Sequence, residues 1–335
     1  MNMRVALVGA GSFGQQHLRA YSLLDGVEVA WICDRDPEAA VRAAASFGVP
    51  RATADLADVL EDPDVDLVDV VTPVASHAPQ AIEALAAGKS VLCEKPMALN
   101  LDQAREMVAA EAASEGQLHV KYHQRFDPVH ERVRDAIADG VYGEALTAHF
   151  SLLGDHMQAL RSRSHWRGDP AVTGGGCLFE SGSHLVDLAH DWFGPARRVT
   201  ARRHQLAAGN PDKGEDTATL VVEFDSGAVM TLVGFWAAPA WDWRKDVFTS
   251  TQVRLTVLTG ADNVLLMEDA AGRREQLAAQ ESWFERSVSA SISHVLQCVR
   301  GEVAPRVTLA DALMSMETLD AAERSATEGR TVELA

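Results

Sequence analysis

An α/β fold is predicted, with a parallel sheet in the first part of the chain and a large open, mostly antiparallel sheet in the rest. Up to about residue 124, short apolar runs alternate with helical patterns, which is typical of right-handed βαβ units. Beyond residue 125 most apolar runs follow one another directly, which favours antiparallel pairing. We therefore expect an α/β domain at residues 1–124 and an α+β domain at residues 125–335.

The first expected strand, residues 4–9, runs into Gly9-Ala10-Gly11-Ser12-Phe13-Gly14, and a helix is expected over residues 13–24. In a Gly-x-Gly-x-x-Gly turn the first glycine permits the bend, the second lets a pyrophosphate approach the backbone, and the third lets helix pack on strand. The phosphates then meet the helix N-terminus. The residues expected to bind a dinucleotide here are Gly9, Gly11, Ser12, Phe13 and Gly14.

Asp34 ends the second expected strand, residues 27–33. A carboxylate at this point accepts hydrogen bonds from both ribose hydroxyls and repels a 2′-phosphate, which favours NAD over NADP. Arg35 beside it suits a 2′-phosphate, so NADP remains the less favoured cofactor. Helix capping is the other role open to Asp34, but Asp36 before Pro37 fits a cap better.

The strand–helix alternation continues to residue 122 and predicts a Rossmann fold. Further strands are expected at residues 51–53, 66–72, 90–93 and 117–122, and further helices at residues 37–47, 56–60, 76–87 and 101–113. Glu94-Lys95-Pro96 follows one of these strands, at the sheet edge where parallel α/β proteins bind ligands. Lys95 would then project toward the ligand, although an exposed lysine before a turn is the alternative.

The run at residues 88–96, together with Gly9–Gly14 and Thr72-Pro73 with His77, resembles the Gfo/Idh/MocA oxidoreductases, which include glucose-fructose oxidoreductase and inositol dehydrogenase. The resemblance extends over essentially the whole chain. It implies that Thr72, Pro73 and His77 line the dinucleotide cleft, and that Glu94 and Lys95 lie beside nicotinamide and substrate.

In the second part a helix is expected over residues 127–138, and Trp241-Asp242-Trp243 falls in an irregular stretch that favours interface packing over a loop reaching an active site. Strands are expected at residues 144–152, 196–205, 217–224, 229–235, 252–258 and 263–267, and late helices at residues 283–299 and 308–325. A sheet with few covering helices leaves a face to bury. We therefore expect a homodimer or homotetramer.

After three glycines at residues 174–176 a single helix is expected, with Glu180, His184, Asp187 and Asp191 on one face. A histidine with a carboxylate one turn away is an acid/base arrangement, whereas metal ligation lacks a third ligand, so no metal is expected.

Comparison with the family pattern adds further expectations for the same region. The resemblance assigns substrate binding to His123, Trp166, Arg167, Glu180 and His184. Glu180 stands where the family has aspartate, and His123 where it usually has asparagine.

Composition narrows the function classes. A net charge of −18 argues against nucleic acid as a partner. No apolar run is long enough for a membrane span or a signal peptide, and the four cysteines are widely spaced, so a reduced cytoplasmic protein is expected.

Together with the acid/base residues, the family resemblance implies reversible oxidation of a secondary alcohol on a sugar, cyclitol or related polyol. His184 would act as base, Glu180 would orient it, and Lys95, with its pKa lowered by the nicotinium charge, would relay the proton. Two alternatives remain: a glycoside hydrolase that holds NAD and oxidises its substrate transiently, and a non-catalytic NAD-binding sensor.

Overall fold

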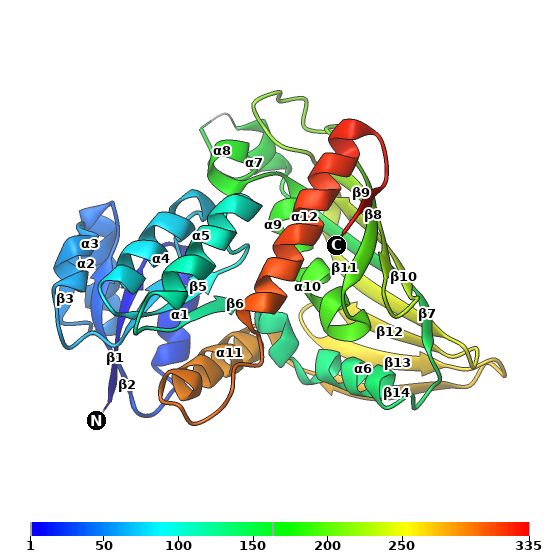
Figure 1. The fold of residues 1–335 in the computed structure, drawn as a ribbon, viewed down its shortest axis with the longest axis horizontal. Coiled ribbons are helices and arrows are strands. Elements are labelled where there is room, and N and C mark those ends of the chain that lie inside the picture. The colour runs from blue at the N-terminus through cyan, green and yellow to red at the C-terminus, as the bar shows by residue number, and fades with distance from the viewer. Residues whose placement is uncertain (1, 163, 335) are drawn as a thin grey trace. The chain divides into compact units, whose positions relative to one another are not determined.

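The computed structural model describes residues 2–162 and 164–334, which form two compact units (Figure 1). The first unit contains the residues up to His123 together with Glu285–Ala312, and the second contains Gln124–Phe284 and the residues from Leu313 onward. The segment Glu285–Ala312 therefore leaves the continuous 125–335 domain expected from the sequence. Its contacts explain this: Arg300 Nη2 donates to Gly26 O at 2.6 Å, and Gln117 Nε2 donates to Cys298 O at 3.4 Å.

Among the described residues, the first unit is built on a six-stranded, all-parallel sheet with the order β3-β2-β1-β4-β5-β6. Its strands are β1 (Met3–Val8), β2 (Val27–Cys33), β3 (Arg51–Thr53), β4 (Leu67–Val70), β5 (Ser90–Glu94) and β6 (Leu118–Lys121). Its helices are α1 (Ser12–Tyr21), α2 (Pro37–Phe47), α3 (Leu56–Leu60), η1 (Val74–Ser76), α4 (His77–Ala86), α5 (Leu101–Ala112) and most of α11 (Trp283–Val299). This strand order is that of a Rossmann fold, as the sequence predicts.

Side-chain caps fix several helix starts at the expected residues. Asp36 accepts from Glu38 N at 3.0 Å just before Pro37, so the cap is indeed Asp36 and Asp34 is available for another role. Thr308 and Asp311 form a reciprocal capping box at the start of α12 (Leu309–Glu328), with Thr308 N donating to Asp311 and Asp311 N donating to Thr308 Oγ1.

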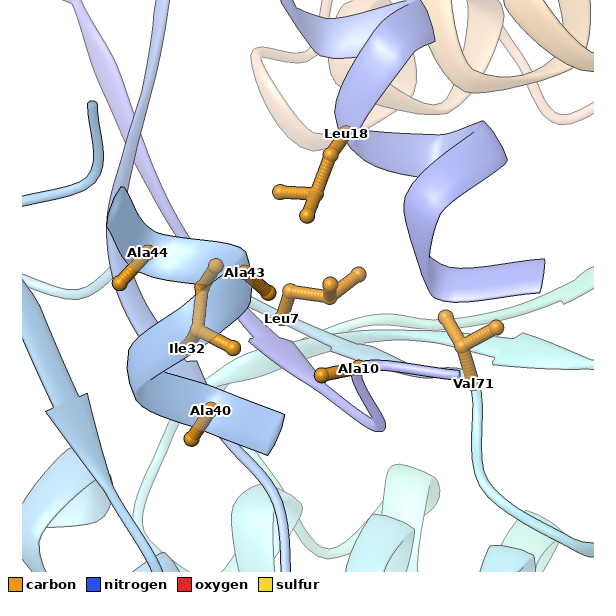
Figure 2. Packing of buried hydrophobic residues seen from close by; sticks show 8 residues of the cluster. All are labelled: Leu7, Ala10, Leu18, Ile32, Ala40, Ala43, Ala44 and Val71. Atoms are coloured by element: carbon orange, nitrogen blue, oxygen red, sulfur yellow. The ribbon is translucent and has the colours of Figure 1, made fainter. Parts of the chain in front are cut away.

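The core of the first unit joins β1, β2, α1 and α2 (Figure 2). Leu7, Leu18 and Ile32 are almost fully buried in it. Three alanines of α2 lie against the same cluster, and their short side chains let the helix approach the sheet closely: Ala40, Ala43 and Ala44. Because Ala10 and Val71 complete the cluster, this packing also fixes the turns that follow β1 and β4.

The second unit contains a nine-stranded sheet in its described residues, with the order β14-β13-β12-β11-β7-β10-β9-β8-β15. Every neighbouring pair is antiparallel except β7 with β10. The strands are β7 (Ala145–Asp155), β8 (Ala196–His204), β9 (Thr217–Phe224), β10 (Val229–Phe235), β11 (Ala237–Thr249), β12 (Arg254–Thr259), β13 (Asn263–Glu268), β14 (Arg274–Gln280) and β15 (Val332–Glu333). The helical elements are η2 (His123–Phe126), which begins one residue before this unit, α6 (Pro128–Ala138), α7 (Met157–Arg161), α8 (Pro170–Thr173), α9 (Cys177–Glu180), α10 (Gly182–Phe193) and most of α12.

The helices α6, α9 and α10 pack on one face of this sheet (Figure 1). No described helix has the length and apolar character that crossing a bilayer requires.

Two sequence predictions in this unit are wrong. The single helix expected after residue 176 is interrupted at Ser181, so Glu180 ends α9 and His184 lies on α10. Trp241-Asp242-Trp243 is not irregular but belongs to β11, where the register against β7 shifts between Ala237 and Asp242. Such a bulge breaks the alternation of buried and exposed residues that identifies a strand in a sequence.

Lys245 of β11 is fully buried and donates to Thr259 Oγ1 at 2.9 Å. Burial lowers the pKa of Lys245 from 10.5 to about 7, although nearby Asp127 opposes this shift. Between these two values the unfolded chain holds a proton that the folded protein does not, so this lysine makes the folding free energy more favourable as the pH rises from about 7 to 10.5.

We expect Lys245→Met to be most stabilising, relative to the wild type, at pH 7 and below. The free energy of unfolding of the variant, relative to that of the wild type, should fall by roughly 2–4 kcal/mol between pH 7 and pH 10. Each unit of pKa shift corresponds to about 1.4 kcal/mol. Urea unfolding of both proteins at several pH values measures this. A difference between them that does not vary with pH would contradict the prediction.

Candidate active site

The three glycines in the turn after β1 have different structural roles. Gly9 has φ +106°, and a Cβ there would lie 2.5 Å from Val71 O. A Cβ on Gly14 would lie 2.0 Å from Gly9 O, whereas one on Gly11 would meet no atom within 4 Å. The first and third glycines are therefore required by packing. The second opens onto free space at the N-terminus of the ten-residue helix α1, where backbone amides favour an anion.

Asp34 is held against this turn. Its Oδ2 accepts from Ala10 N at 2.7 Å, and its Oδ1 accepts from Asp36 N at 2.9 Å. These two bonds fix the carboxylate at the end of β2, beside the glycine turn. Arg35 is exposed, as are Ser12 and Phe13 at the start of α1. The residues of this edge thus fit an adenosine ribose and a pyrophosphate.

The turns after β4 and β5 are joined by His77, the first residue of α4. Its Nε2 lies 2.8 Å from Thr72 O, and its Nδ1 lies 2.9 Å from Pro96 O. Burial lowers the pKa of His77, so the ring is neutral and donates to one of the two carbonyls at a time. Thr72 Oγ1 donates to Gln80 at 2.7 Å, and the Lys95–Pro96 peptide bond is cis. His77 therefore braces Thr72-Pro73 against Glu94-Lys95-Pro96.

A buried ionic network lies beneath these turns. Lys121, at the end of β6, has its Nζ 2.6 Å from Glu94 Oε1 and 2.7 Å from His17 Nε2. His17 Nε2 also lies 3.0 Å from Glu94 Oε1, and His17 Nδ1 lies 2.7 Å from Asp69 Oδ2. Burial lowers the pKa of His17, but the neighbouring carboxylates, Asp69 first, outweigh burial and raise this pKa overall. Tyr21 donates to the same Asp69 oxygen at 2.9 Å. The network therefore extends from α1 through β4, β5 and β6.

The buried ionic network fixes the position of the Lys95 backbone. Burial alone would raise the pKa of Glu94, but the neighbouring positive groups, Lys121 first and then His17, together outweigh burial and hold this pKa well below its usual range. The charged Glu94 then uses its second oxygen, Oε2, to accept from Lys95 N at 3.1 Å. Lys95 itself is half-buried. The backbone of Lys95 is thus fixed by a carboxylate that cannot readily lose its charge.

His123 belongs to the same electrostatic environment. It is 1% exposed, and its Nδ1 lies 2.8 Å from Ser287 Oγ on α11. Burial, followed by the charge of Lys121, holds the pKa of His123 well below its usual range, so the ring is neutral. A neutral ring suits hydrogen bonding to a hydroxyl better than pairing with an anion.

In the second unit, Arg167 connects the predicted substrate residues. Its Nη1 forms an ion pair with Glu180 Oε1 at 3.0 Å, and its guanidinium lies 5.1 Å from the centre of the Trp166 ring. Trp166 is 43% exposed. His184 is buried on α10, and its ring centre lies 6.2 Å from that of Trp243. The structure therefore brings Trp166, Arg167 and Glu180 together.

Asp187 and Asp191 have a different role from Glu180. Arg125 binds Asp187 in a bidentate manner, at 3.0 and 2.8 Å, and its Nη1 lies 3.5 Å from Asp191. All three side chains are buried or nearly so. The pairing neutralises Asp187 and ties η2 to α10, so it stabilises the second unit.

Three members of the buried network, His17, Asp69 and Lys121, were not predicted as site residues. The sequence contained a usable signal: Asp69 lies in an otherwise apolar run and Lys121 in an expected strand. Charges in buried strands are almost always paired. The sequence did not show which residues pair with one another in this network.

Comparison with known proteins adds to this geometry. Residues 3–122 match the model of an oxidoreductase family with an NAD-binding Rossmann fold. Residues 130–257 match the model of the Gfo/Idh/MocA C-terminal domain, and residues 259–334 match an oxidoreductase-family C-terminal α/β domain. The chain belongs to the Gfo/Idh/MocA oxidoreductase family.

Relatives of this Gfo/Idh/MocA protein include enzymes of known name. D-apiose dehydrogenase of Paraburkholderia graminis is 30% identical, over 98% of this chain and 89% of the relative. The scyllo-inositol 2-dehydrogenase (NAD(+)) of Bacillus subtilis is 26% identical, over 99% of this chain and 96% of the relative. The crystal structure of GenD2 from gentamicin A biosynthesis, in complex with NAD, has a TM-score of 0.86 and 29% identity, and the match covers 100% of this chain and 97% of that one.

These matches confirm the family, the Rossmann fold and the class of activity predicted from the sequence. They also confirm NAD as the cofactor. The roles of individual residues remain predictions.

Proposed function

We propose that this protein is an NAD-dependent dehydrogenase that reversibly oxidises a secondary alcohol of a sugar, cyclitol or related polyol. The observation that carries the proposal is the edge of the first sheet. There the glycine turn after β1, Thr72-Pro73 after β4 and Glu94-Lys95 after β5 follow three adjacent parallel strands. The relatives named above act, by their names, on a sugar and a cyclitol, and this supports the substrate class.

NAD⁺, when bound, accepts a hydride. The chain's own residues would handle the proton: His184 removes it from the hydroxyl as the C–H bond breaks, and a ketone forms. Lys95 hydrogen-bonds the reacting oxygen. Glu180, held by Arg167 at 3.0 Å, orients the base, and His123, Trp166 and Arg167 bind the substrate. Asp34, whose two oxygens are both fixed by backbone amides, favours NAD over NADP.

A panel of sugars, cyclitols, linear polyols and aminosugars, each tested with NAD and with NADP, measures this function as absorbance of the reduced cofactor. We expect NADH to form with at least one member, and at a higher kcat/KM than NADPH. Cleavage of a glycoside without net NADH would support the hydrolase instead. Tight NAD binding without any turnover would favour the sensor.

We also propose a homodimer or homotetramer formed through the second sheet. On the face opposite α6, α9 and α10, apolar side chains of several strands are half-buried or exposed, including Val233 at 44% and Leu258 at 37%. An uncovered sheet face that carries exposed apolar side chains is a candidate subunit interface. Sedimentation equilibrium would measure the mass of the assembly, and a monomer at micromolar concentration would contradict it.

The location we propose is the cytoplasm. All four cysteines are free thiols and buried, which fits a reducing compartment.

A further inference from the structure

Two tryptophans of β11, Trp241 and Trp243, lie next to the predicted acid/base residues of the second unit. We call this pair the tryptophan wall. The two ring centres are 6.1 Å apart, and Trp243 lies 6.2 Å from the ring of His184. Trp241 is 50% exposed. Part of the Trp241 indole is therefore open to a ligand, beside the buried residues that are predicted to carry the chemistry.

Two further residues, His156 and Arg167, connect the tryptophan wall to Glu180. The ring of His156 contacts that of Trp241 edge-on, with centres 4.9 Å apart. Arg167 Nη1 lies 3.0 Å from His156 Nε2 and 3.0 Å from Glu180 Oε1. Burial, and then the charge of Arg167, lower the pKa of His156 to about 3, so its Nε2 is an acceptor for Arg167.

The contacts therefore form a continuous chain of side chains from His184 through both tryptophans to Glu180. Glu180 ends α9 and His184 lies at the start of α10, so the two ends of this chain of contacts are on helices separated only by Ser181. The part near His184 is aromatic, and the part near Glu180 is ionic.

Trp241 is held in place before any ligand binds. A Cβ on Gly154 would lie 3.1 to 3.3 Å from three atoms of the Trp241 ring, so the indole rests directly on the backbone of β7. The register shift of β11 between Ala237 and Asp242 allows this placement. Because the ring is already immobilised, stacking a ligand on its exposed surface has little additional cost in side-chain entropy.

We propose that the tryptophan wall is a stacking surface for a cyclic substrate, a pyranose or cyclitol ring, and that it selects such rings over linear polyols. This inference rests on the proposed function and narrows its substrate class. A six-membered polyol ring has an apolar C–H face that covers an indole, while its hydroxyls point outward, toward groups such as Arg167 and Glu180. A linear polyol offers no rigid face, and ordering it on the wall costs rotational freedom.

The test compares Trp241→Ala with the wild type on the best cyclic and the best linear member of the polyol panel. We expect KM for the cyclic compound to rise about tenfold or more with kcat changed less than about twofold, and KM for the linear compound to change little. Trp241→Phe should restore most of the loss, and the NAD dissociation constant should not move. Leu206→Ala, a change at a 70% exposed apolar residue of the same unit, is the matched control and should behave as wild type.

An unchanged KM for the cyclic compound, or an equal rise for both compounds, would overturn the inference. A second readout separates it from the proposed function: equilibrium titration of tryptophan fluorescence with the same panel. Ring-selective quenching that Trp241→Ala abolishes supports the wall even if no compound is oxidised, in which case the dehydrogenase proposal alone fails. Equal quenching by cyclic and linear compounds would refute the proposal that the tryptophan wall selects cyclic substrates.

Discussion

Lys95→Ala is expected to lower kcat by roughly 10²- to 10⁴-fold, the range typical for loss of a group that assists proton transfer. The effect should fall on chemistry rather than on folding. The backbone of Lys95 is held by Glu94 Oε2, and Glu94 is held in turn by Lys121, so neither contact uses the Lys95 side chain. The NAD dissociation constant should therefore stay within a few-fold of wild type.

Steady-state kinetics on the substrate found in the panel, together with calorimetric NAD binding, measure both expectations. Lys95→Arg is the matched variant, since it keeps the positive charge but holds its proton at every accessible pH. It should restore little of the turnover if proton relay is the role. Turnover of the alanine variant within a few-fold of wild type would show that the assignment of Lys95 is mistaken.

Gly11→Ala is expected to weaken NAD binding by roughly 10- to 100-fold without lowering the thermal midpoint. Gly11 has φ −66°, which alanine adopts easily, and a Cβ there meets no atom of the protein within 4 Å. The added methyl group would instead occupy the space through which a pyrophosphate reaches the backbone. The loss should appear in the dissociation constant of NAD measured by calorimetry.

Gly9→Ala and Gly260→Ala serve as comparisons. At Gly9 the positive φ and the 2.5 Å approach to Val71 O should cost roughly 1–3 kcal/mol of stability or more. At Gly260, between β12 and β13, a Cβ meets nothing within 4 Å, so both stability and NAD binding should be unaffected. If Gly11→Ala bound NAD as tightly as wild type, the phosphate cradle would have to be sought elsewhere.

The amino-acid sequence alone was enough to predict the strands and helices of the first unit up to residue 123, but not that Glu285–Ala312 packs with them. Strand and helix patterns are local, and so are the caps at Asp36 and Thr308, because each depends on residues within one or two turns. The glycine turn is equally local. The bend, the glycine that is open to the pyrophosphate and the start of the helix all fall within six residues. The spacing of the glycines was therefore enough to predict which edge of the sheet binds the cofactor.

Tertiary structure decided which charged and aromatic residues meet. His17, Asp69, Glu94 and Lys121 come from four segments, and their order along the chain carries no record of which oxygen faces which nitrogen. The same holds for Trp241, which rests on Gly154 across a strand pair and follows a register shift that hides the alternation of its strand. A sequence pattern shows whether a side chain faces inward or outward. Its partner is set by how strands and helices distant in the chain pack, because only packing brings those atoms within bonding distance.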